Sequence, residues 1–106
     1  MEYTIIWSRF SENQIDKIYD YYETRVNTKL AKKIVKSILS APDQLIKNPK
    51  IGALESSLKN REIEYRYIVS TNYKIVYSVG ELDKSVRIAD VFDTRQHPNK
   101  IEQRIK

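Results

Sequence analysis

The side chains best suited to chemistry in this sequence are basic and aromatic, because the usual metal ligands and nucleophiles are nearly absent. The 106 residues include no cysteine and one histidine, His97. Cysteine-ligated zinc and thiolate nucleophiles are therefore excluded. The two glycines, Gly52 and Gly80, stand in no phosphate-binding pattern, so there is no P-loop or dinucleotide fingerprint. We predict no metal and no cofactor, which leaves metal-free catalysis or binding.

Basic residues alternate with apolar ones along three segments that are typical of β-strands. From residue 62 the apolar residues recur at every second position, over 63–69 and again over 73–79, and residues 86–93 form a third segment. Side chains alternate between the two faces of a strand. If the tyrosine-rich rows face the core, the complementary row is basic and points outward: Arg66, Lys74, Arg87 and Arg95.

This outward basic row has two interpretations. Four cations on one uncovered sheet face would form a site for an anion, a phosphate or another target. Alternatively, they are ordinary solubility residues, and Glu62 and Glu64 neutralise part of their charge. His97, in a Gln-His-Pro segment, is more typical of a surface loop than of a general acid.

The chain as a whole is basic, with 19 Lys and Arg against 14 Asp and Glu, a formal net charge of +5 and a pI near 9.4. Its length fits a single domain, residues 1–106, since domains cluster around about 100–150 residues. Uninterrupted apolar runs are far shorter than the roughly 20 residues that cross a bilayer. The N-terminus lacks the basic start and long apolar stretch of a signal peptide. We expect a cytoplasmic protein without membrane contact.

The N-terminal half is predicted to form a strand and a helical hairpin. Residues 3–8 are rich in β-branched and aromatic residues, which indicates a strand. Ser11 begins a capping box with Gln14, and an amphipathic helix of about 14 residues follows. After a short interruption a second helix runs toward Asn48, with a kink or break expected near Pro42. A turn this short predicts that the two helices pack antiparallel.

The C-terminal half is predicted to form a meander of three antiparallel strands, because turns of only a few residues join them. The tail, residues 98–106, has Ile101 and Ile105 at helical spacing, which indicates a short helix. The element order is β-α-α-β-β-β, so the fold class is α+β. We expect an antiparallel sheet with the helical hairpin on one face and the other face open.

Three short motifs follow one another in the C-terminal half. Tyr65-Arg66-Tyr67 opens one strand, Tyr73-Lys-Ile-Val-Tyr77 forms the next, and the third leads into Thr94-Arg-Gln-His-Pro98. Upstream stand Trp7-Ser8, the helical hairpin and the segment Leu45-Ile-Lys-Asn-Pro-Lys-Ile-Gly52. Taken in this order, over nearly the whole chain, the combination resembles the RelE/ParE superfamily of type II toxins.

The resemblance implies a small basic toxin, neutralised by an acidic-tailed antitoxin that is encoded beside it and forms a hetero-oligomer with it. Such systems are also known for plasmid stabilisation. Two mechanisms occur in the family. RelE-like members enter the ribosomal A site and cleave mRNA without a metal, by attack of the 2′-hydroxyl on the adjacent phosphate. ParE-like members poison DNA gyrase and have no known hydrolytic centre.

Residue by residue, the resemblance implies roles only for some positions. Arg66 and Lys74 match basic catalytic positions of RelE-like toxins, although Lys74 stands where several members have arginine and so lacks the bidentate fork. Arg95 matches a C-terminal arginine common to both branches. Tyr73 and His97 are the candidate proton donors.

Asp93 argues against a nuclease. It lies where nuclease members often carry an aromatic residue or a histidine, and a carboxylate there would repel phosphate. The incomplete acid–base pair therefore favours the ParE-like mechanism slightly over the RelE-like one. A further alternative is a non-catalytic module that binds nucleic acid through the same basic face, without toxicity. The chain could also be an inactive family member.

Overall fold

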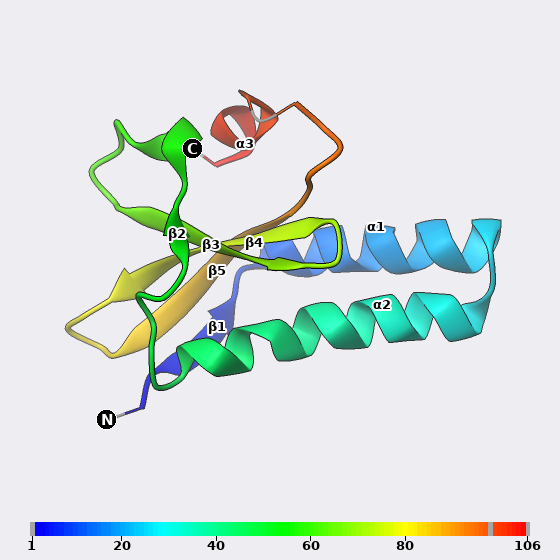
Figure 1. Ribbon diagram of the computed structural model, residues 1–106, viewed down its shortest axis with the longest axis horizontal. Helices are drawn as coiled ribbons and strands as arrows, with labels where there is room; N and C mark the ends of the chain where they lie inside the picture. Colours follow the sequence, from blue (N-terminus) through cyan, green and yellow to red (C-terminus); the bar gives the residue numbers. More distant parts are fainter. Residues whose placement is uncertain (1, 98, 106) are drawn as a thin grey trace.

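The order of helices and strands in the computed structural model, which describes residues 2–97 and 99–105, confirms the α+β class. A strand and two helices come first, the strands of a meander follow, and a short helix ends the chain (Figure 1). The elements are β1 (Thr4–Trp7), α1 (Arg9–Arg25), α2 (Thr28–Ser40), the 3-10 helix η1 (Ala41–Leu45), β2 (Ala53–Leu54), the 3-10 helix η2 (Ser56–Leu58), β3 (Tyr65–Ser70), β4 (Tyr73–Gly80), β5 (Ser85–Asp93) and α3 (Asn99–Arg104).

The sheet has five strands in the order β1-β5-β4-β3-β2. The predicted meander of β3, β4 and β5 is antiparallel throughout, and the two-residue strand β2 extends it antiparallel to β3. At the other edge β1 pairs with β5 in parallel. The hairpin α1–α2 provides the long connection that takes the chain from β1 to the far edge of the sheet.

The hairpin begins three residues earlier than the capping box predicted. Ser8, not Ser11, is the N-cap of α1: its backbone is extended and its Oγ accepts a hydrogen bond from the Ser11 backbone N–H at 3.1 Å. Ser11 lies inside the first turn, where its Oγ donates to the Ser8 carbonyl oxygen at 2.7 Å. Because β1 ends at Trp7, a cap at Ser8 lets the helix start directly after the strand.

The second helix ends where the proline predicted a break. Asn27 caps its start, since the Asn27 side-chain oxygen accepts from the Leu30 N–H at 2.7 Å. The α-helix stops at Ser40, and Pro42 lies in the first turn of η1, which continues the path to Leu45. A proline cannot donate to the preceding turn, so the α-helical hydrogen bonding cannot run through it. The hairpin packs antiparallel, as predicted, and its tip extends past the sheet (Figure 1).

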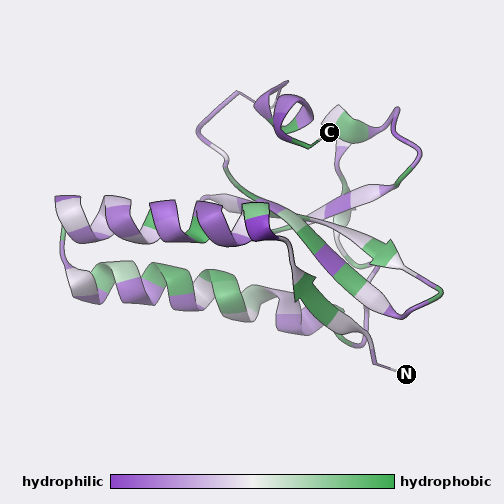
Figure 2. Ribbon diagram, turned by 180° about the vertical axis from the view of Figure 1, so that it is seen from behind, coloured by the Kyte–Doolittle hydropathy of each residue, from purple (hydrophilic) through white to green (hydrophobic). Residues whose placement is uncertain are grey.

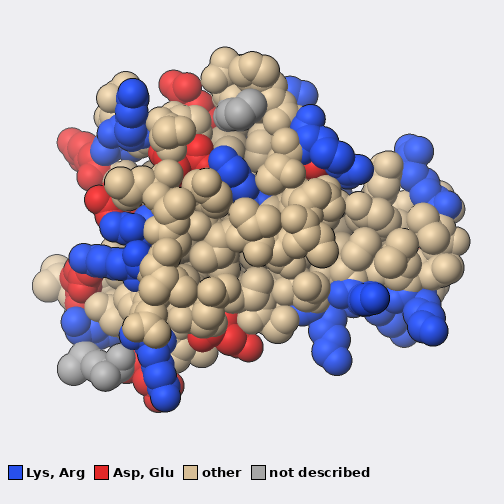
Figure 3. All heavy atoms as spheres, viewed as in Figure 1, with Lys and Arg blue, Asp and Glu red and all other residues tan. Residues whose placement is uncertain are grey.

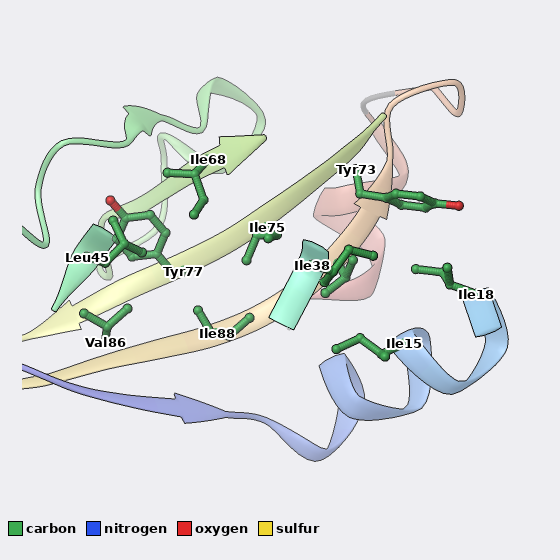
Figure 4. Packing of buried hydrophobic residues seen from close by; sticks show 11 residues of the cluster. Ile15, Ile18, Ile38, Leu45, Ile68, Tyr73, Ile75, Tyr77, Val86 and Ile88 are labelled. Atoms are coloured by element: carbon green, nitrogen blue, oxygen red, sulfur yellow. The ribbon is translucent and has the colours of Figure 1, made fainter. Parts of the chain in front are cut away.

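The main core lies between the hairpin and one face of the sheet. Figure 4 shows Ile15 and Ile18 of α1 and Ile38 of α2 pointing toward side chains of β4 and β5. Each buried isoleucine or leucine contributes roughly 1.5–3 kcal/mol to this packing. The α2 helix is more hydrophobic than α1, with apolar pairs of residues alternating with lysines, whereas α1 is mostly hydrophilic outside its core stripe (Figure 2). The buried members of the cluster are Ile15, Ile18, Ile38, Leu45, Ile68, Tyr73, Ile75, Tyr77, Val86, Ile88 and Val91.

The opposite sheet face is not open, which corrects the sequence prediction. A second, smaller core covers it: Leu58 of η2, with Ile101 and Ile105 at the end of the chain, packs on Val76 and Phe92 of the sheet. Val76 and Phe92 are almost completely buried. The central strands therefore carry apolar side chains on both faces, and a sheet of this kind needs a cover on each side. The predicted C-terminal helix, α3, supplies that cover, although Pro98 itself lies outside the described residues.

A β-bulge in β5 changes which side chains face the hairpin. Val76 pairs with Asp90 but its neighbour Tyr77 pairs with Ile88, so Ala89 is an extra residue in β5. A bulge reverses the alternation of the side chains that follow it. Val91 therefore faces the main core just as Ile88 does, three positions earlier. The reversal brings the end of β5 and the residues after it toward α1.

Candidate functional site

The four basic residues predicted to share one face lie on different parts of the sheet. Arg66 belongs to the same strand row as Ile68, which is buried in the main core on the hairpin side. Lys74 lies on the other face, where its Nζ is 4.2 Å from the Tyr67 ring centre. The prediction that Arg66 and Lys74 point the same way is wrong, because Tyr65 and Tyr67 pack against the second core and not the first.

Arg66 serves to hold a loop on the edge of the sheet. Its Nη1 donates to the carbonyl oxygens of Lys50 at 3.1 Å and Gly52 at 2.8 Å, and its Nη2 lies 3.1 Å from a Glu64 carboxylate oxygen. Its cross-strand neighbour Tyr77 donates to the Pro49 carbonyl oxygen at 2.6 Å. These contacts engage both terminal nitrogens of the guanidinium, while its Nε is buried without a hydrogen-bond partner, so Arg66 is committed to the fold.

Gly52 explains why this loop can lie so close to the sheet. The Gly52 N–H donates to the Tyr77 hydroxyl at 3.0 Å. A Cβ at residue 52 would collide with that hydroxyl and with the backbone carbonyl of Tyr67. Burial of the Tyr77 ring raises the pKa of its phenol, although the Gly52 N–H and the charge of Arg66 lower it. Tyr77 is therefore a protonated structural donor.

Lys74 is paired with a carboxylate that is almost fully buried. Its Nζ lies 2.9 Å from Glu55 Oε1, and Glu55 is only 2% exposed. Burial works against ionisation of Glu55, but hydrogen bonds from Lys74 and from the Ser57 hydroxyl and N–H outweigh it and lower the pKa. Glu55 is thus an anion that holds Lys74 against the Tyr67 ring. No pattern in the sequence identified Glu55 as the partner, since 19 residues separate the pair.

Arg87 and Arg95 are the most exposed of the four, with 60% and 59% of their side chains accessible. Arg87 lies 2.6 Å from Asp83, and the pKa of Asp83 is lowered by the Ser85 hydroxyl and by Arg87. Arg95 binds both carboxylate oxygens of Asp93, through its Nε and through an Nη2 contact of 2.7 Å. This two-pronged contact is the main reason why the pKa of Asp93 is lowered.

A cleft of about 310 Å³ separates α1, the end of β5 and α3, and it gathers two of the predicted site residues. Tyr73 and Arg95 both line it, as do Lys17 and Tyr21 of α1 and Arg104 of α3. The Tyr73 ring points toward α1 (Figure 4), and its hydroxyl donates to the Tyr22 hydroxyl at 3.2 Å. The bulge in β5 turns Val91 and Asp93 toward this cleft, and Arg95 lies beside them through its contacts with Asp93.

The two candidate proton donors differ in their surroundings. Tyr73 is 3% exposed, and burial followed by the contact with Tyr22 raises the pKa of its phenol well above the usual range. It therefore stays protonated near neutral pH, where it can donate a hydrogen bond but cannot serve as a base. His97 is exposed, and its Nδ1 accepts from the Asn99 N–H at 3.2 Å. His97 does not line the cleft of Tyr73 and Arg95.

The site as built contains paired cations rather than free ones. Each of the four basic residues has a carboxylate oxygen within 3.1 Å: Glu64 for Arg66, Glu55 for Lys74, Asp83 for Arg87 and Asp93 for Arg95. Across residues 2–97 and 99–105, no group of three or more His, Cys, Asp or Glu side chains could hold a metal ion. Within the same residues, no helix is long and apolar enough to cross a membrane.

Comparison with known proteins assigns the chain to a family. The family model described as the ParE toxin of the type II toxin–antitoxin system parDE matches residues 5–98. The chain belongs to the ParE toxin family. It is accordingly a toxin of a type II toxin–antitoxin system, and its partner is an antitoxin. A search of curated proteins gives no match.

Solved structures share the fold of this ParE-family toxin at low sequence identity. A chain of the chromosomal ParDE system from P. aeruginosa is 20% identical, with a TM-score of 0.67 over 86% of this chain and 95% of that one. The free E. coli toxin RelE, in a form with two arginines replaced by alanine, is 12% identical, with a TM-score of 0.66 over 99% of this chain and 95% of that one. The fold is thus common to both branches of the superfamily.

Proposed function

We propose that this toxin arrests growth by poisoning DNA gyrase, the ParE-like mechanism, and not by cleaving mRNA. Its membership of the ParE family supports the proposal. The observation that carries it is the pairing of every candidate catalytic cation with a carboxylate. A protein that acts by binding an enzyme needs no free cation cluster, whereas one that cleaves a phosphodiester does.

RNA cleavage requires free cations for the following chemical reason. The 2′-hydroxyl loses a proton to a base and attacks the adjacent phosphorus, and the 5′-oxygen leaves with a proton from an acid, which yields a 2′,3′-cyclic phosphate. The phosphorane formed on the way carries extra negative charge that only free, well-placed cations can stabilise. Here Arg66 is occupied by carbonyl oxygens, Lys74 by Glu55 and Arg95 by Asp93.

For the contact with the target, we propose the two exposed arginines, Arg87 and Arg95, with Arg66 and Lys74 supporting the surface from within. A cation that keeps most of its surface in solvent can exchange an intramolecular carboxylate for one on a partner at little cost. The proposed neutralising partner is an antitoxin with an acidic segment, which suits the net charge of +5. Gyrase and the antitoxin both place the toxin in the cytoplasm, in a toxin–antitoxin hetero-oligomer.

The test is induced expression of the toxin without an antitoxin. We expect growth arrest with gyrase-dependent DNA breaks and intact mRNA, and we expect the Arg87→Ala/Arg95→Ala variant to need more toxin for the same arrest. Lys59→Ala/Lys100→Ala, which removes two exposed charges elsewhere, is the matched control. Indifferent growth with a folded wild-type chain would instead indicate an inactive member or a non-catalytic nucleic-acid-binding module.

A RelE-like nuclease is the second candidate, because Tyr73 and Arg95 line one cleft beside Lys17 and Arg104. In that case Tyr73 would be the acid that protonates the 5′-oxygen, and Arg95 would leave Asp93 to bind the phosphate. This mechanism predicts mRNA cleavage on translating ribosomes that is abolished by Arg95→Ala and by Tyr73→Phe, with intact DNA. Cleaved mRNA with unbroken DNA would overturn the gyrase proposal.

A further inference from the structure

The net positive charge of this protein resides on one part of the helical hairpin. Residues 24–42 contain five basic side chains and no acidic one, and the other 87 residues hold 14 of each sign. The whole formal charge of +5 is therefore matched by the five basic residues at the end of α1 and on α2. The five are Arg25, Lys29, Lys32, Lys33 and Lys36.

The four lysines of this group form a single stripe along α2. At about 100° per residue, positions 29, 32, 33 and 36 fall within an arc of about 100°. The stripe is about 10 Å long, since a helix rises about 1.5 Å per residue. All four side chains are exposed, whereas Ala31 and Ile38, on the opposite side of the helix, are completely buried. Figure 3 shows several Lys and Arg side chains along the lower right edge of the molecule, where α2 lies, besides others on the left and upper edges.

The lysine stripe differs from the basic residues of the sheet in having no carboxylate partner. In the part of the chain that the structure describes, ion pairs form at Lys50, Arg66, Lys74, Arg87, Arg95 and Arg104, and none includes a residue of α2. Glu23 of α1 accepts a hydrogen bond from the Thr28 hydroxyl at the start of α2 at 3.3 Å, but no acidic residue of α1 forms an ion pair with the lysine stripe among the described residues. Glu12, Asp16, Asp20 and Glu23 lie on one side of α1 by the same 100° rule, away from the apolar stripe that faces the core.

We propose that the lysine stripe of α2 is a docking surface for the phosphate backbone of duplex DNA, bound without regard to sequence. The four ammonium groups are unpaired, of one sign, and aligned over a length that spans several phosphates of a double helix, which carries about one charge per 1.7 Å of axis. Because the hairpin extends past the sheet, a rod-like ligand can lie along α2 without meeting the β-strands (Figure 1).

The composition of the stripe favours duplex DNA over other polyanions. Single strands are bound through aromatic side chains on which unpaired bases stack, and the stripe contains no aromatic residue. An acidic protein partner would need apolar anchors at the centre of its contact. Tyr19, Val35 and Leu39 line a hollow beside Lys32 and Lys36, so competition with poly-glutamate distinguishes such a partner from DNA. Lysine is a point charge without the planar fork of arginine, so it suits a repeating backbone better than one particular carboxylate.

Binding of a fluorescent 20-base-pair duplex of arbitrary sequence, measured by anisotropy at 50–200 mM salt, tests this inference. Three or four neutralised phosphates predict that log K falls with log salt at a slope of about −3. In Lys32→Gln/Lys36→Gln the slope should become shallower by about 2, and the affinity at 100 mM salt should fall at least tenfold. Lys32→Arg/Lys36→Arg should retain binding. Lys59→Gln/Lys100→Gln, with the same net charge, should lose less than threefold.

Four outcomes would overturn the inference. The first is that the wild-type chain does not bind the duplex at 50 mM salt, and the second is that the stripe variant and the matched control lose the same affinity. The third is that a single strand of the same length binds equally tightly or more tightly. The fourth is that poly-glutamate at equal charge displaces the duplex. Circular dichroism of each variant establishes that it is folded. The inference does not require gyrase as the target, because DNA binding in vitro and growth arrest in cells are measured separately.

Discussion

The cations of the sheet and the cations of α2 are held in opposite ways. On and around the sheet each basic residue of the predicted site has a carboxylate within 3.1 Å, and Arg104 of α3 has one at 2.7 Å. On α2 four exposed lysines stand side by side with no such partner among the described residues. Charge on the sheet is therefore part of the folded structure, whereas charge on α2 is available for binding.

The comparison shows that whether a cation is available for binding depends less on its position in the sequence than on whether the fold gives it a carboxylate partner. Arg66 and Lys74 match functional positions of related toxins in sequence, but their contacts fasten a loop and a buried glutamate. The lysines of α2 match no motif, yet they form a continuous row of exposed cations with no ion pair among the described residues. If this difference is real, removal of a sheet cation should destabilise the fold, and removal of an α2 lysine should not.

The largest effect is expected at the buried pair of Arg104 and Asp90. Arg104 Nη2 lies 2.7 Å from Asp90 Oδ1, Asp90 is completely buried, and its Oδ2 has no partner. Arg104→Met keeps the apolar stem but leaves a buried carboxylate without a cation, so the free energy of unfolding should fall by about 3–5 kcal/mol. Urea unfolding measures it. Lys100→Met, on an exposed site of the same helix, should change the value little, and equal losses would contradict the account.

The pH dependence of Asp90 gives the next largest effect. Burial raises its pKa to about 6, although Arg104 lowers it. An unfolded aspartate titrates near 3.9, so the folded state binds the proton more tightly and stability falls as pH rises from about 4 to 6. Asp90→Asn does not titrate. Its free energy of unfolding, relative to the wild type, should therefore increase by up to about 3 kcal/mol between pH 4 and 7. A difference that stays constant over this range would refute the assignment.

Lys74→Gln should have a smaller effect, because Lys74 is 21% exposed and part of the lost charge contact can be replaced by water. The free energy of unfolding should fall by about 1–2 kcal/mol at pH 7, since Glu55 remains buried and ionised. The lowered pKa of Glu55 makes its stabilising contribution disappear as pH falls, so the effect of the variant should shrink in acid. The double variant with Glu55→Gln should recover part of the loss, and strict additivity would argue against the pair.

The sequence specified the elements well because their signals are local. The periods of the hairpin and the meander, the break at Pro42 and the final helix all depend on neighbouring residues, and all are present. The assignment of faces was wrong for non-local reasons. Tyr65 and Tyr67 pack, partly buried, against the second core on the side expected to be open, and the extra residue Ala89 reverses the alternation in β5.

The candidate site was harder to predict than the fold, because a basic side chain reveals nothing about its partner. Glu55 reaches Lys74 only through the folded chain, and the cleft of Tyr73 and Arg95 exists only because the bulge turns β5 toward α1. The lysine stripe is the opposite case. The absence of any acidic residue from 24 to 42 is visible in the sequence, and charge counted helix by helix rather than over the whole chain reveals it.

The smallest expected effect, and the only one of opposite sign, is at Lys36. Lys36 follows Lys32 by four residues and Lys33 by three, and like charges at these spacings destabilise a helix by about 0.2–0.5 kcal/mol per pair. Lys36→Gln removes both pairs and should therefore stabilise the fold slightly, by about 0.4–1 kcal/mol at low salt, and the gain should vanish at 1 M salt. Urea unfolding at both salt concentrations measures it, with Lys59→Gln as the control. A loss as large as that of Lys74→Gln would show that Lys36 has a structural partner and would remove the contrast between the two regions. A higher free energy of unfolding in Lys36→Gln would mean that the lysines of α2 lower the stability of the fold. This is expected of side chains whose partner is another molecule.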